Sequence, residues 1–141
     1  MRGKIIIESN AKILAYKRIN KKKYARPGIW ALHGQLDSGG WKCLEVSQTT
    51  NVYRDIKRAI YMLTTPDDKK CERHVRFLYG IKFQKENLTR VHKYRSIIKP
   101  NYQKFRFVCV NISDSMRDLD ERLDVEEEYA VVQNTSAWFD W

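Results

Sequence analysis

The chain has 141 residues, and 43% of them are hydrophobic and 12% aromatic, a composition that fits one folded domain and argues against a disordered chain. No apolar run reaches the roughly 18 residues of a membrane-spanning helix, and Ile5–Ile7 is too short for a signal-peptide core. We therefore expect a cytoplasmic protein with no membrane partner. The net charge of +10 hides an asymmetry, because residues 112–141 carry nine acids against two arginines.

The basic part of the chain indicates the kind of partner. Residues 1–26 alone carry nine Lys/Arg and one acid, and residues 90–106 interleave Lys and Arg with Tyr. Such surfaces attract polyanions, and aromatic rings among the charges are typical of nucleic-acid binding. We expect DNA or RNA as the partner, with an acidic protein or simple solubility as the alternatives.

Cysteine usage agrees with a reducing compartment. The three cysteines, Cys43, Cys71 and Cys109, are an odd number and imply no disulfide framework. Cys71 and His74 could form half of a zinc site, but the sequence offers no second half. No Gly-rich phosphate loop occurs, so we expect no organic cofactor.

The first part of the chain reads as strands. Residues 4–8 are β-branched and predict a short strand, whereas the basic run 11–25 could be strand or helix. After a break at Arg26-Pro27-Gly28, the apolar runs 28–33 and 41–46 flank a Gly-rich connection. This pattern predicts a β-hairpin.

A helix should follow the hairpin. Thr50 or Asn51 can serve as its N-cap, and Thr64–Asp67 ends it. The apolar residues between them recur at helical spacing and predict a buried face. They are Val52, Ile56, Ala59, Ile60 and Leu63.

The second half is mixed. Residues 70–98 are helical or irregular, and we expect Phe77, Leu78, Ile81 and Phe83 to lie inside. Residues 104–112 alternate and predict a strand, and 116–132 predict an acidic helix through the spacing of Met116, Leu119, Leu123 and Val131. Two tryptophans close the chain.

Several residues along this order of elements match one family. Gly28-Ile29-Trp30 looks like a GIY element, Glu45-Val46-Ser47 stands where YIG would stand, and Gln48–Val52 resembles the polar segment that follows it. Glu128, followed by two valines and an aromatic-rich end, is similar to the acidic residue near the end of the same pattern. The chain thus resembles the GIY-YIG endonuclease family over residues 28–64 and 104–141.

The resemblance implies an α+β fold, with a small mixed or antiparallel three-stranded sheet flanked by helices. We expect one domain over 1–141, with a basic N-terminal extension over 1–26. The family hydrolyses phosphodiesters with a divalent metal held by one Glu, while two tyrosines and an Arg surround the phosphate. In this chain Trp30, Glu45 and Asp55 replace the tyrosines and the arginine.

These replacements leave alternatives open. The chain could be a metal-dependent nuclease for DNA or RNA with a rearranged site. It could instead be an inactive member of the fold that binds nucleic acid, or one that inhibits a protein or a protein–nucleic acid complex. In the nuclease hypothesis Glu128, or Glu127 beside it, holds Mg²⁺ or Mn²⁺, and Glu45 could join them.

The other candidate residues follow from charge and position. Arg58 or Arg54 would neutralise the phosphate, with Tyr53 and His33 as further catalytic candidates. Each has a structural alternative: the arginines could lie on a solvated helix face, Glu127 and Glu128 could face solvent, and Trp30 could be core. The residues expected to bind nucleic acid are Lys21, Lys22, Lys23, Arg26, Lys57, Lys93, Arg95 and Lys104.

Overall fold

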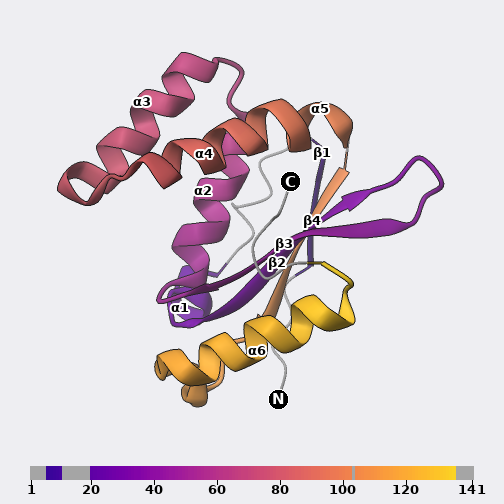
Figure 1. Cartoon of the computed structure of the whole chain (residues 1–141), viewed down its shortest axis with the longest axis vertical. Coiled ribbons are helices and arrows are strands. Elements are labelled where there is room, and N and C mark those ends of the chain that lie inside the picture. The colour runs from indigo at the N-terminus through magenta and orange to yellow at the C-terminus, as the bar shows by residue number, and fades with distance from the viewer. Residues whose placement is uncertain (1–5, 11–19, 103, 136–141) are drawn as a thin grey trace.

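The computed structural model describes residues 6–10, 20–102 and 104–135. An antiparallel sheet in the order β1-β4-β2-β3 separates two helical layers (Figure 1). The expected α+β class is confirmed. The sheet has four strands where the family resemblance implied three, because β1, which overlaps the strand predicted over residues 4–8, pairs with β4. In chain order the elements are β1 (Ile6–Asn10), α1 (Lys21–Tyr24), β2 (Gly28–Gln35), β3 (Trp41–Thr49), α2 (Val52–Thr64), α3 (Asp68–Tyr79), η2 (Gly80–Lys82), α4 (Lys85–Lys93), the π-helical turn η3 (Tyr94–Ile98), α5 (Lys99–Asn101), β4 (Lys104–Asn111), η4 (Asp114–Arg117) and α6 (Leu119–Val132).

The predicted hairpin forms the centre and one edge of the sheet. β2 pairs with β3 on one side and with β4 on the other, and Gly28 lies where β2 approaches β4. A Cβ atom at Gly28 would meet the Asn111 carbonyl oxygen at 2.4 Å, so only glycine fits there. A bulge at Leu44 places Glu45 opposite Leu32.

The larger hydrophobic core lies between the sheet and the helical layer of α2, α3, α4 and η3, and Tyr24 of α1 joins it. The helix predicted after the hairpin is confirmed as α2, and Asn51 caps it by accepting a hydrogen bond from the Arg54 N–H at 3.0 Å. The predicted apolar face of α2 is fully buried. Trp30, expected in the core, is 1% exposed and packs against Phe107 of β4.

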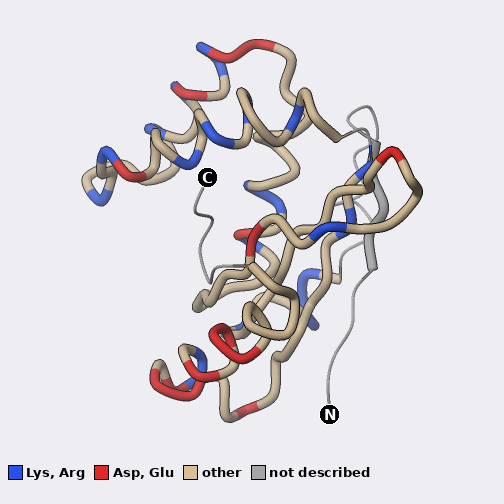
Figure 2. The backbone as a smooth tube through the Cα atoms, turned by 45° about the vertical axis from the view of Figure 1, so that its right-hand side comes forward, with Lys and Arg blue, Asp and Glu red and all other residues tan. Residues whose placement is uncertain are grey.

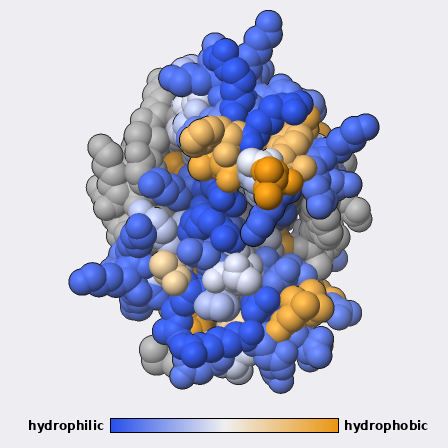
Figure 3. Space-filling view, turned by 90° about the vertical axis from the view of Figure 1, so that its left-hand side faces the viewer, coloured by the Kyte–Doolittle hydropathy of each residue, from blue (hydrophilic) through white to orange (hydrophobic). Residues whose placement is uncertain are grey.

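Helices α3 and α4 form a hairpin that projects from this layer (Figure 1). We expected Phe77, Leu78, Ile81 and Phe83 to lie inside. This prediction is wrong for the first three, whose exposed fractions are 81%, 38% and 103%, and Phe83 is partly exposed. Phe77 is exposed because α3 packs through its opposite face, where Cys71 and Val75 are buried. Leu78 lies near the end of that buried face, and Ile81 belongs to the short turn η2. The space-filling view of the left-hand side of Figure 1 shows apolar areas within a hydrophilic surface (Figure 3).

The predicted acidic helix is α6, which covers the other face of the sheet. It packs on a second, smaller core around Ile29, Val46 and Val110. The apolar residues whose spacing predicted this helix lie mostly on its outer side, since Leu119 and Val131 are exposed. Across all the described residues, no helix has the length and apolar character that crossing a bilayer requires.

Candidate nucleic-acid interface

A basic groove of about 530 Å³ runs along the outer side of α2, between α1 and α3. It collects residues that the sequence suggested for two different roles, because Tyr53, Arg54 and Arg58 were catalytic candidates and Lys21 and Lys57 were expected to bind nucleic acid. Among the described lining residues four are Lys or Arg, and none is Asp or Glu. Tyr53, Tyr61 and His74 supply aromatic rings to the same walls.

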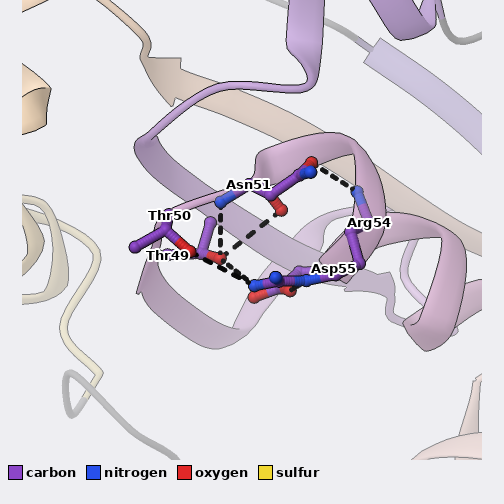
Figure 4. A network of polar contacts seen from close by, with 5 residues as sticks. All are labelled: Thr49, Thr50, Asn51, Arg54 and Asp55. Atoms are coloured by element: carbon purple, nitrogen blue, oxygen red, sulfur yellow. Dashed lines mark hydrogen bonds and ion pairs between the residues drawn. The ribbon is translucent and has the colours of Figure 1, made fainter. Parts of the chain in front are cut away.

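Arg54 is held in place at the N-terminal end of α2 (Figure 4). Its guanidinium donates to the hydroxyl oxygens of Thr49 and Thr50, at 3.3 and 3.5 Å, and pairs with the carboxylate of Asp55 at 3.1 Å. Asn51 accepts a bond from the Arg54 backbone, so the same polar segment both caps the helix and orients the side chain. A guanidinium with this support presents its remaining donors in a fixed direction.

The rest of the α2 face is arranged in two rows. Tyr53, Lys57 and Tyr61 follow one another at intervals of four residues, and Arg54 and Arg58 form the neighbouring row. The Lys57 ammonium lies 5.9 Å from the centre of the Tyr53 ring. Cations and rings therefore alternate along one wall of the groove.

Charge differs between the two helical layers. Acidic residues concentrate on α6, whereas Lys and Arg predominate on α2 to α4 (Figure 2). The groove lies in the basic layer, on the opposite side of the sheet from α6. A polyanion approaching the molecule is attracted to the groove side and repelled by α6.

Behind the groove, the position that corresponds to YIG holds a buried ion pair. Glu45 is 0% exposed; it accepts a hydrogen bond from the Tyr94 hydroxyl and pairs with Arg90 at 3.1 Å. Burial raises the pKa of the Glu45 carboxyl, and Arg90 and Tyr94 oppose that rise. Both carboxylate oxygens thus face protein groups of the α2 layer, and Glu45 does not meet Glu128 of α6.

Glu128 lines a shallow hollow on the α6 side, and its neighbour Glu127 is also exposed. Asn111 and Gln133 also line this hollow with polar side chains. Glu128 is the one carboxylate among the described residues that line this hollow, and no Lys or Arg is among them. Nowhere in the described part of the chain do three His, Cys, Asp or Glu side chains gather as metal ligands would.

His33 also lies on the α6 side. Its Nε2 atom is 3.2 Å from the Tyr129 hydroxyl, and it is 8% exposed. Burial, with Arg106 as a smaller cause, lowers the pKa of the His33 imidazole. The structure therefore places His33 in a packing position, across the sheet from Arg54 and Arg58.

The remaining predicted cations lie outside the groove. Arg26 pairs with Asp114 at 2.8 Å, and Arg95 pairs with Asp68 at 2.8 Å while donating to the Met62 carbonyl. The Arg95 side chain is only 5% exposed, so it joins α2, α3 and η3. The others are distributed over α1, α4 and the start of β4: Lys22, Lys23, Lys93 and Lys104.

We compared the chain with family models, curated proteins and solved structures. No family model matches it, and neither does any curated protein or solved structure. The resemblance to the GIY-YIG family, and the Mg²⁺ or Mn²⁺ that it implies, stay predictions.

Sequence reasoning missed part of the groove and all the partners of Glu45. Tyr61 could have been found, because it continues the row of Tyr53 and Lys57 on the polar side of α2. His74, Arg90 and Tyr94 come from α3, α4 and η3, whose packing no local pattern specifies.

Proposed function

We propose that this protein binds nucleic acid in the basic groove along α2, as a binding module that needs no catalytic step. The observation that carries the proposal is the convergence of Lys21, Arg54, Lys57 and Arg58 on one concavity with no acid among its described lining residues. Phosphates of the backbone supply the complementary charge, and binding them releases counterions. The two arginines can also donate paired hydrogen bonds to phosphate oxygens.

The geometry favours binding over the nuclease hypothesis. Hydrolysis would require the groove arginines and the proposed metal ligand Glu128 to reach the same phosphate. Those residues belong to the two opposite layers of the molecule. Binding requires only the groove itself.

The test is the salt dependence of binding, measured by fluorescence anisotropy with a labelled oligonucleotide between 50 and 200 mM salt. If all four cations contact phosphates, the slope of log K against log salt is about −3, since each contact contributes about 0.7 to 0.9. Lys57→Gln should weaken binding and reduce the slope by about one such contact. Lys42→Gln is the matched control, because Lys42 is also an exposed lysine, lies on the hairpin and is not among the described residues that line the groove.

Equal affinities and slopes for wild type, Lys57→Gln and Lys42→Gln would refute the groove as the binding site. The same mixtures with Mg²⁺ or Mn²⁺ test the nuclease hypothesis. Metal-dependent cutting that is lost in Glu128→Ala would support it, whereas binding without cutting supports the present proposal.

A further inference from the structure

We infer that the groove receives unstacked bases, so that its ligand is single-stranded rather than double-stranded nucleic acid. This inference rests on the proposed function and specifies the class of substrate. It follows from the rings in the groove, whereas the proposed function follows from the charges.

The rings form a surface that spans two helices. Tyr61 of α2 and His74 of α3 lie with their centroids 4.3 Å apart and their planes inclined by 37°. Both side chains are partly exposed and line the groove. Tyr53 lies two turns earlier on the same row of α2, about 12 Å away along the helix axis. The groove therefore offers two separate places where a flat group could pack against a ring.

The surroundings of the rings match a nucleotide. Val75 and Leu78 add apolar surface near His74, and Arg58 and Lys57 lie beside Tyr61 on α2. Bases stack on aromatic side chains, while the backbone follows neighbouring cations. A concavity of about 530 Å³ is in the range of pockets that enclose small organic groups.

A duplex cannot use these rings. Its bases stack on one another and present only their edges in the grooves, so an aromatic side chain reaches a base face only after the base leaves the stack. Duplex nucleic acid could contact the cations of the groove but not the faces of its rings. Single strands, loops and ends present faces without that cost.

The experiment compares one short oligonucleotide as a single strand and as a duplex, using the full chain, in DNA and in RNA form. We expect the single strand to bind at least ten-fold more tightly. Tyr61→Leu, which keeps apolar volume and removes the ring, should weaken single-strand binding by about 5- to 150-fold and leave duplex binding nearly unchanged. Trp41→Leu is the matched control, because Trp41 is also partly exposed and its ring packs under Arg106, 4.1 Å away, outside the groove.

A second measurement needs no variant and guards against loss of folding in Tyr61→Leu. A single strand that carries 5-iodouracil is irradiated on the wild-type protein, and the cross-linked residue is identified by mass spectrometry. We expect cross-links at Tyr53, Tyr61 or His74. Cross-links confined to other residues would overturn the inference.

The two proposals fail in different ways. If the wild-type chain binds neither single strand nor duplex, the proposed function is wrong. If binding depends on salt and on Lys57 but is equal for single strand and duplex, only the inference about bases is wrong. Equally tight binding of a mononucleotide and of the strand would also overturn it, because the ligand would then be a free nucleotide.

Discussion

Replacing Arg90 by methionine should destabilise the protein strongly and in a pH-dependent way. The substitution keeps the apolar stem and removes the charge that lies 3.1 Å from the Glu45 carboxylate. Glu45 is 0% exposed, so its carboxylate cannot turn to water when the partner is lost. Removing one member of a buried pair typically costs about 3–5 kcal/mol, and we expect Arg90→Met to fall in this range at pH 8.

Replacing the other member of the pair, Glu45, should lower the free energy of unfolding by less. Glu45→Gln still accepts a hydrogen bond from Tyr94, and it leaves Arg90, whose side chain is 28% exposed and can reach solvent. We expect a loss of about 1–2 kcal/mol. The double variant should lose less than the sum, with a coupling of about 2–3 kcal/mol, because the two groups act as one unit.

The pH dependence follows from the Glu45 pKa. Burial raises this pKa in the folded state, and the loss of Arg90 raises it further. Between the ordinary pKa and the raised one, the folded state binds more protons than the unfolded state, so the free energy of unfolding falls as pH rises. The difference in the free energy of unfolding between wild type and Arg90→Met should therefore become smaller as the pH falls toward the ordinary pKa of a glutamate.

The assay is urea unfolding followed by tryptophan fluorescence, at pH 5 and pH 8, for the wild type and the three variants. Two results would refute the reasoning. One is a cost below about 1 kcal/mol for Arg90→Met at pH 8, far under the value for a broken buried pair. The other is a cost of Glu45→Gln equal to that of Arg90→Met.

Two further predictions concern the sheet and the thiols. Gly28→Ala should cost about 2–3 kcal/mol in the same urea assay, since the new Cβ would lie 2.4 Å from a backbone oxygen of β4; Gly40→Ala, whose nearest atom is 3.7 Å away, should be close to neutral, and equal costs would contradict the packing account. Cys43, Cys71 and Cys109 are buried, and burial raises the pKa of Cys43 and of Cys109 to about 12, so the native protein should not react with Ellman's reagent at pH 8 until urea unfolds it. Rapid reaction of any thiol in the native protein would contradict this placement.

The sequence predicted the elements whose signals are local. The Gly-rich hairpin, the cap at Asn51 and the apolar spacing of α2 each depend on a few neighbouring residues, and all three were found. The sequence did not predict which side chains of residues 70–98 are buried. An apolar residue such as Phe77 looks the same in sequence whether its helix turns it inward or outward. Glu45 shows the same limit for the site, since its partners lie 45 and 49 residues away on α4 and η3.

The contact between α6 and β3 has a consequence for aggregation. β3 is an edge strand, and edges pair readily with other chains. Glu126 of α6 accepts a hydrogen bond from the backbone N–H of Gln48 at 2.7 Å, and Arg122 donates to the Gln48 side chain at 2.9 Å. The acidic helix thereby occupies a donor that a foreign strand would otherwise use. A chain shortened before α6 would lose this protection, and its hairpin would be the place where intermolecular β-pairing begins.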